Sequence, residues 1–261
     1  MDIYTLLETN LGYFLLIFVR LSGMFATAPL FGGRNIPPIA KTGLALTFAY
    51  IIAPIILPVT NIAMPESLLP YILLIFSEYF VGLILGFVTY IVFFGIQMAG
   101  AILDVQIGFG MVNVIDPQLG QQIPLIGNFK YILALLVYLA TNCHHLLLTA
   151  LFDSFTVAPL AQTASLGGLA MLLADITKNI YVIALKIAFP VLISVFLTEV
   201  ALGILSKTMP QLNIFVVGIP ARIIVGIFML IFGLPFYITL LEVLFTGMVS
   251  DLYKILWQLR L

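Results

Sequence analysis

The sequence predicts an all-α integral membrane protein, and three observations support this fold class. The 261 residues are 63% hydrophobic and 8% charged, whereas soluble domains are about 45–50% apolar and about 25% charged. The apolar residues gather in six main stretches, and about 20 such residues are enough for a helix to span a bilayer. Prolines interrupt several of these stretches. We therefore expect about six long, kinked helical segments in a single membrane-embedded domain of residues 1–261.

The six apolar stretches bound the predicted helices. At about 1.5 Å per residue, the 36 residues of Leu68–Leu103 would form a straight helix of roughly 54 Å. The hydrocarbon core is only about 30 Å thick. The longest segments must therefore bend, break into hairpins or protrude from the lipid. The segments are Leu11–Phe31, Ile39–Val59, Leu68–Leu103, Tyr131–Phe152, Leu169–Leu205 and Ile214–Phe245.

Helix-breaking and small residues lie inside these segments. Each internal proline removes one helical hydrogen bond, so a neighbouring helix has to compensate for it. Gly82 and Gly86 form a small-xxx-small pattern, which either allows close approach of another helix or is a chance occurrence in a Gly-rich chain. The prolines expected to kink helices are Pro54, Pro58, Pro190, Pro220 and Pro235.

Ionisable residues also occur within the apolar segments. A charged residue at a helix centre costs about 2.5–3.5 kcal/mol on insertion scales, so these side chains are not expected to face lipid. A proton or ion relay is one interpretation. Pairing across helices or subunits is favoured, because both signs are present and no carboxylate cluster is found. We expect protein contacts to bury Arg20, Glu78, Lys186, Glu199, Arg222 and Glu242, and Lys41 and Lys178 are further such charges.

The stretch Asp104–Asn128 differs from the rest of the chain. It contains four Gly and four Gln, yet eleven of its 25 residues are Val, Ile, Leu, Met or Phe. Unpaired backbone in hydrocarbon costs several kcal/mol per group, so irregular chain of this kind belongs in a protein-lined cavity. We interpret Asp104 and Asp116 as loop residues. The stretch therefore predicts a re-entrant or plugging loop beside a pathway.

Several function classes are excluded or disfavoured. The net charge of −1 provides no basic surface for nucleic acid. The chain contains no H-E-x-x-H, G-x-S-x-G, G-x-x-x-x-G-K-[ST] or G-x-G-x-x-G motif, so we expect neither an enzyme nor a cofactor. His144 and His145 are adjacent, and on a helix they point about 100° apart, which makes a poor chelate. We expect them to be interfacial polar residues, with no metal site.

Three strings in the chain are similar to a known family. They are FVRLSGMFATAPLFGGRNIPPIAKTGLAL (Phe18–Leu46), GIQMAGAILDVQIGFGMVNVIDPQLGQQIPLIGNF (Gly95–Phe129) and TMPQLNIFVVGIPARIIVG (Thr208–Gly226). Together they resemble the FliR family of flagellar export-gate proteins, to which the SctT group of virulence secretion is related. The resemblance covers essentially the whole chain.

The resemblance implies a subunit of the type III export apparatus in the bacterial inner (cytoplasmic) membrane, within the flagellar basal body. Its partners would be FliP-like and FliQ-like subunits, an FlhB-like protein and the unfolded flagellar proteins that are exported. It implies a FliP-like part over about residues 1–165, including loop 104–128, and a FliQ-like helical hairpin over about residues 166–245. Residues 246–261 indicate an amphipathic C-terminal tail, from the helical spacing of Leu252, Ile255, Leu256 and Leu259, with Trp257 suited to an interface.

By the same resemblance, Gln106–Gln122 lies in the pore and helps to plug it. Glycines allow such a loop to move, and apolar side chains block a channel by dewetting. The alternative is a loop that only packs between helices. The plug residues are Gln106, Gly108, Phe109, Gly110, Met111, Val112, Asn113, Val114, Ile115, Asp116, Pro117, Gln121 and Gln122, and an assembly motif comprises Pro210, Gln211, Asn213, Phe215, Gly218 and Pro220.

Two other functions remain open from the residues alone. A secondary transporter for a small solute would use broken helices and internal charges around a midplane site. It would also show an inverted repeat, and the two halves of this chain show none clearly. A purely structural scaffold would differ because removing the loop would leave permeability unchanged.

Overall fold

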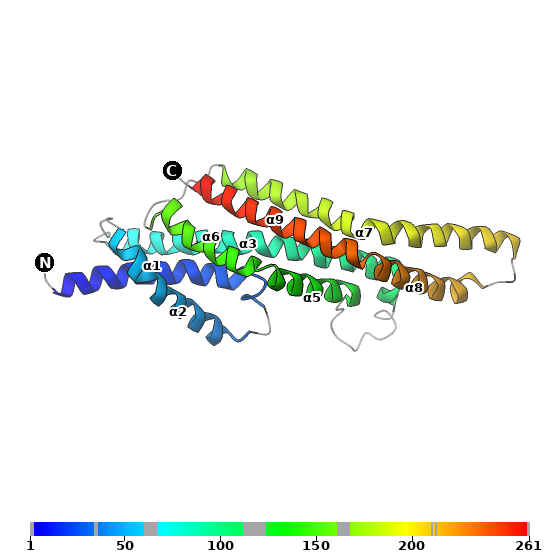
Figure 1. The fold of residues 1–261 in the computed structure, drawn as a ribbon, viewed down its shortest axis with the longest axis horizontal. Coiled ribbons are helices and arrows are strands. Elements are labelled where there is room, and N and C mark those ends of the chain that lie inside the picture. The colour runs from blue at the N-terminus through cyan, green and yellow to red at the C-terminus, as the bar shows by residue number, and fades with distance from the viewer. Residues whose placement is uncertain are drawn as a thin grey trace. The chain divides into compact units, whose positions relative to one another are not determined.

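The computed structural model describes residues 3–33, 36–59, 67–111, 124–160, 168–209, 211 and 213–259. Every regular element over these residues is helical, which confirms the predicted all-α membrane protein (Figure 1). The α-helices are α1 (Ile3–Thr27), α2 (Pro38–Ile56), α3 (Leu68–Ile107), α5 (Leu125–Ala140), α6 (Cys143–Val157), α7 (Leu169–Thr208), α8 (Ile214–Phe232) and α9 (Leu234–Leu259), with short 3-10 helices η1 (Leu57–Val59) and η2 (Phe109–Met111).

Four helices, α2, α3, α7 and α9, are long and apolar enough to cross a membrane within the described ranges. Helices α3 and α7 each have 40 residues. Pro190 lies inside α7 and Pro220 inside α8 without ending either helix. The long segments are thus continuous helices rather than hairpins.

Two predicted segments are divided. Tyr131–Phe152 contains the end of α5 and the start of α6, which are separated at Asn142, where a positive φ of 56° is incompatible with a continuing helix. Ile214–Phe245 is divided at Gly233 between α8 and α9. Pro235 therefore lies in the first turn of α9, where its missing N–H has no helical partner to lose.

The chain forms two compact units. The first unit contains Met1–Ile91, Asn142–Thr177 and Thr246–Leu261, and the second unit contains Val92–Thr141 and Lys178–Phe245. The division of the chain at about residue 165 into FliP-like and FliQ-like parts rests on the resemblance alone and stays a prediction.

In the first unit, α1 and α3 approach at glycines. A Cβ atom on Gly82 would meet the backbone carbonyl of Arg20, and one on Gly86 would meet the Thr27 hydroxyl. A Cβ on Gly23 would lie 2.5 Å from the carbonyl oxygen of Tyr79. The small-xxx-small pattern is therefore a packing feature of this chain and not a chance occurrence.

The predicted C-terminal tail is the end of α9 rather than a separate helix. Its apolar side chains are buried in the first unit, whereas Trp257 is 60% exposed. The buried residues are Leu252, Ile255, Leu256 and Leu259, each exposed by 2% or less.

The second unit has an aromatic core. Phe93 on α3, Tyr138 on α5 and Phe245 on α9 lie with their ring centroids 5.4–5.6 Å apart. Tyr131 extends the cluster at 5.6 Å from Phe93. These distances are in the range in which aromatic pairs attract beyond simple area burial.

Candidate functional site

The Gly- and Gln-rich stretch begins inside a helix. The predicted loop starts at Asp104, but α3 continues to Ile107. The Asp104 carboxylate points from α3 to the start of α5. Its oxygens accept hydrogen bonds from the backbone N–H groups of Ile126, at 3.0 and 3.1 Å, and of Gly127, at 3.1 Å. The interpretation of Asp104 as a loop residue is therefore wrong. A buried carboxylate there satisfies first-turn N–H groups and complements the helix dipole.

Helices α3 and α5 are in backbone contact beside this carboxylate. A Cβ on Gly100 would meet the Cα of Gly127, and a Cβ on Gly127 would lie 3.2 Å from the carbonyl oxygen of Gln97. A side chain on Gly100 would prevent this approach, and one on Gly127 would require its neighbours to shift. The two ends of the stretch are thus held together inside the second unit.

The end of α3 is also fixed against α8. Gly108 has a φ of 105°, which ends the helix, and its N–H donates to the carbonyl of Asp104 at 3.3 Å. A Cβ on Gly226 of α8 would lie 2.6 Å from Cγ1 of Ile107, so Ile107 packs directly on the α8 backbone. The chain therefore leaves α3 at a defined point and in a defined direction.

The structure describes the first part of the predicted plug. Gln106 is half-buried in α3, Gly108 is buried, and Phe109 and Gly110 are half-buried in or beside η2. Met111 ends η2. The other predicted plug residues lie outside the described residues, namely Val112, Asn113, Val114, Ile115, Asp116, Pro117, Gln121 and Gln122.

The predicted assembly motif lies at the start of α8. The Asn213 carbonyl accepts hydrogen bonds from the N–H groups of Val216 at 3.1 Å and Val217 at 3.3 Å, so Asn213 begins the helix. Gln211 and Pro220 are exposed, and Gly218 is buried. Phe215 belongs to α8, and Pro210 lies outside the described residues.

Arg20 is the most connected of the predicted buried charges. Its Nε donates to Glu78 at 2.6 Å, and the two side chains are 1% and 2% exposed. Its Nη1 donates to the Ser154 carbonyl at 2.9 Å, and its Nη2 donates to the Ala158 carbonyl at 3.0 Å. The guanidinium lies 4.5 Å from the ring centroid of Phe155. One arginine therefore ties α1 to α3 and α6 within the first unit.

The other four predicted charges lie in the second unit and are less buried. Arg222 on α8 pairs with Glu199 on α7 at 2.9 Å, with side chains 23% and 38% exposed. Lys186 and Glu242 are exposed on the surface of the chain. Burial of these two residues in an assembly stays a prediction.

Sequence reasoning missed the capping role of Asp104, although one signal was present. Pro124 stands just before α5 and has no side-chain oxygen to accept the N–H groups of the first turn. An acceptor therefore has to come from elsewhere in the chain, and Asp104 was the buried carboxylate next to a Gly-rich helix end.

Long apolar helices that carry internal ion pairs define a multi-pass membrane protein. The family model described as "Bacterial export proteins, family 1" matches residues 11–248. The chain therefore belongs to the FliR family of bacterial export proteins. It is a component of the flagellar export apparatus, and the family is not a family of enzymes.

Three relatives illustrate the range of the family. The flagellar biosynthetic protein FliR of Bacillus subtilis is 43% identical over 221 residues, which is 84% of each chain. FliR of Escherichia coli is 29% identical over 243 residues, 93% of this chain and 92% of the relative. The Yop proteins translocation protein T of Yersinia pestis is 32% identical over 154 residues, 58% of each chain.

Proposed function

We propose that this chain forms, together with FliP-like and FliQ-like subunits, the channel through which unfolded flagellar proteins cross the bacterial inner membrane, and that Gln106–Gln122 plugs this channel. An FlhB-like protein would complete the assembly. The observation that carries the proposal is the fixed pair of ends, Gly108 on one side and the Asp104-capped start of α5 on the other. Fixed ends would keep α3 and α5 in place when the proposed plug opens.

The composition of the loop supports a seal made by apolar contact. Phe109, Met111 and Ile115 can exclude water from a constriction without adding a charge that would hold a passing chain. Met also adapts its shape to uneven neighbours. Such a seal would block ions when no polypeptide is in the channel and would open when an unfolded polypeptide enters.

The surface of α7 supports assembly with other membrane subunits. Phe189, Phe196 and Leu197 are 57–59% exposed, and Lys186 is exposed among such residues. A lysine facing lipid near a helix centre costs about 2.5–3.5 kcal/mol, so a protein neighbour is a better environment for this face. Large exposed apolar surface next to a charge fits a subunit contact.

Deleting the centre of the loop tests the proposal. Removal of Gly110–Gln118 preserves the Asp104 cap of α5, so the complex is expected to assemble and to leak ions. Planar-bilayer conductance or proteoliposome ion flux measures the leak, which should be absent when the partner subunits are absent. An assembled complex with unchanged conductance would leave the loop as packing between helices.

A matched series of serine substitutions distinguishes loss of the channel seal from a general loss of apolar surface. Phe109→Ser, Met111→Ser and Ile115→Ser should each produce a weaker leak than the deletion. Met171→Ser removes an apolar side chain that is 76% exposed on α7 and should leave conductance unchanged. A small-solute transporter, the alternative function, would instead show saturable uptake of one solute that the deletion abolishes.

A further inference from the structure

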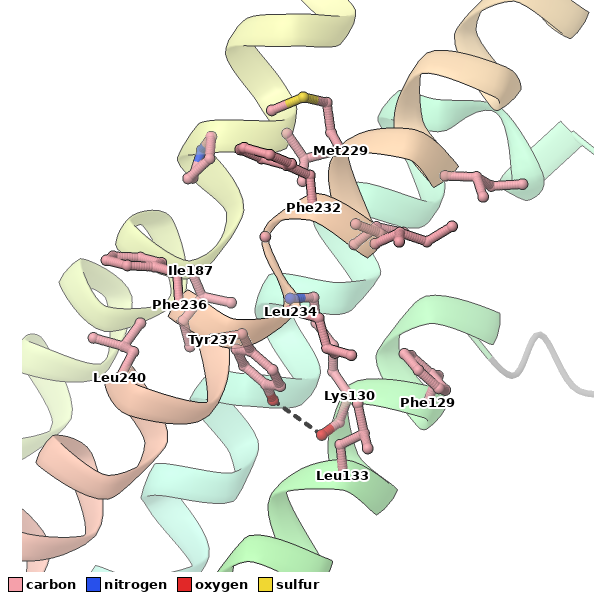
Figure 2. Close-up of a pocket in the computed structure, with 16 residues that line it drawn as sticks. Phe129, Lys130, Leu133, Ile187, Met229, Phe232, Leu234, Phe236, Tyr237 and Leu240 are labelled. Carbon is pink, nitrogen blue, oxygen red and sulfur yellow. Dashed lines mark hydrogen bonds between the residues drawn. The ribbon is translucent and has the colours of Figure 1, made fainter.

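The second unit contains a cavity that none of the proposed plug residues lines. It has a volume of about 560 Å³ and lies among α5, α7, α8 and α9 (Figure 2). Small-molecule pockets are typically about 300–1,000 Å³ and mostly apolar. Most of the wall is hydrocarbon or aromatic, from residues such as Leu133, Ile187, Val191, Ile227, Phe236 and Leu240.

One charged side chain lines this cavity. Lys130 on α5 is only 5% exposed, and no hydrogen bond or ion pair reaches its ammonium from the described part of the chain. Its Nζ lies 4.0 Å from the ring centroid of Tyr237. In Figure 2 its side chain runs past Tyr237 toward the junction of α8 and α9. The ring face attracts the cation but supplies no negative charge.

The second polar side chain at the wall is already satisfied. The Tyr237 hydroxyl donates to the backbone carbonyl of Lys130 at 3.0 Å (Figure 2). This bond fixes the ring under the ammonium. The cavity therefore presents one unpaired cation against an otherwise apolar wall.

A buried, unpaired ammonium is costly, so it favours an anionic partner. The matching ligand has one anionic group and a hydrocarbon tail. A partner helix with a carboxylate fits less well, because a helix of about 10 Å diameter and 5.4 Å pitch fills roughly 400 Å³ per turn. The cavity would therefore accept little more than one turn of a partner helix. An acyl chain is much thinner than a helix and fits into it.

We propose that this cavity holds an acyl chain of an anionic membrane phospholipid, whose phosphate pairs with Lys130. The proposal depends on the chain being in a membrane and not on the export function or on the plug. The bound lipid stabilises the break between α8 and α9 at Gly233, next to which the ammonium is directed.

Photolabelling of the purified export complex tests this site. The complex is placed in phosphatidylcholine nanodiscs that contain phosphatidylglycerol with a diazirine near the end of its acyl chain, and labelled peptides are mapped after irradiation. Label is expected on α5 around Leu133 and on α7 around Ile187. Phosphatidylcholine with the same diazirine should label these peptides about tenfold less, because its choline cation repels the Lys130 ammonium and cancels the net negative charge of the headgroup.

Variants of Lys130 identify the source of selectivity. Lys130→Met should reduce phosphatidylglycerol labelling to the phosphatidylcholine level, whereas Lys130→Arg should keep most of it. Lys178→Met removes an exposed lysine of α7 that does not line the cavity and should leave labelling unchanged. If Lys130→Met does not assemble, Leu133→Phe fills the cavity while keeping the charge and should also abolish labelling.

Two results would overturn the proposal. Equal labelling of the wild-type cavity by both lipids would mean that Lys130 selects nothing. Absence of lipid label, together with capture of a partner subunit by a photoreactive residue at position 133, would assign the cavity to a protein neighbour. Neither result depends on whether the loop deletion opens the channel, so the two proposals fail separately.

Discussion

Two of the ion pairs in the described part of the chain differ in their surroundings. Arg20 and Glu78, in the first unit, are 1% and 2% exposed, and the guanidinium also bonds to two backbone carbonyls. Arg222 and Glu199, in the second unit, are 23% and 38% exposed and share one contact at 2.9 Å. Charges removed from water need a complete set of partners, whereas half-exposed charges do not. The first pair therefore joins α1 to α3 within the first unit. The second pair stays partly exposed and can contact a neighbouring subunit.

The largest effect is expected at the first pair. Arg20→Met removes the guanidinium that pairs with the buried Glu78 carboxylate, which should destabilise the chain by about 3–5 kcal/mol. Thermal unfolding of the purified complex and the amount of assembled complex measure the loss. The double variant Arg20→Met with Glu78→Met should recover part of the stability, because no lone charge remains. If the complex with Arg20→Met unfolded at the same temperature as the wild-type complex, the structural role assigned to this pair would be wrong.

The next effect is expected where α1 meets α3. Gly82→Ala places a methyl group against the Arg20 carbonyl and should cost about 1–3 kcal/mol through overpacking. Gly43→Ala on α2 is the control, because a Cβ there meets nothing within 4 Å. That change should be neutral or stabilising by about 0.5–1 kcal/mol. Equal unfolding temperatures for the two variants would show that the contact does not constrain the helices.

A smaller effect is expected at the start of α5. Asp104→Ala removes the acceptor of the Ile126 and Gly127 N–H groups and should cost about 1–2 kcal/mol. Hydrogen exchange of these two amides should accelerate, while Asp104→Asn, which keeps one oxygen, should change it less. Unchanged exchange in Asp104→Ala would mean that the loop ends are held by the glycine contact alone.

The smallest effect is expected at the second pair. Arg222→Gln should change the stability of the chain by about 0–1 kcal/mol, as for other partly exposed pairs. A double-mutant cycle with Glu199→Gln, followed by thermal unfolding, measures the coupling free energy. A coupling above about 3 kcal/mol would place this pair in the same class as Arg20 and Glu78 and remove the distinction between the two units.

The fold was predictable to the extent that it depends on hydrophobic length. Leu169–Leu205 was identified as one segment and lies within the 40-residue α7. The break at Asn142 was not predicted, because the polar run from Thr141 to His145 is short and lies inside a longer apolar stretch, and only the positive φ shows the interruption. The same limit applies to Asp104. The Gly-rich composition predicted a loop there, but Asp104 lies in α3 and accepts hydrogen bonds from N–H groups more than 20 residues away in sequence.

The contacts of the candidate site could not be predicted from the sequence, and its role as a plug stays a prediction. Gly108 and Phe109 were assigned to the plug, and the structure describes where the chain leaves α3. The partners of the charges could not be derived, because Arg20 and Glu78 are 58 residues apart in sequence, and Arg20 and Ser154 are 134 apart. No periodicity connects residues at that separation.

By itself the sequence determined that this chain lies in a membrane as helices, because apolar composition and length decide whether backbone groups must be satisfied within each segment. The three sequence strings Phe18–Leu46, Gly95–Phe129 and Thr208–Gly226 were also enough to identify the family. Only the tertiary structure decided which charges pair, which glycines let helices touch, and that Lys130 borders an apolar cavity in which no described residue pairs with its ammonium. These outcomes depend on distances between segments far apart in the chain, and packing sets those distances only when all the helices are in place.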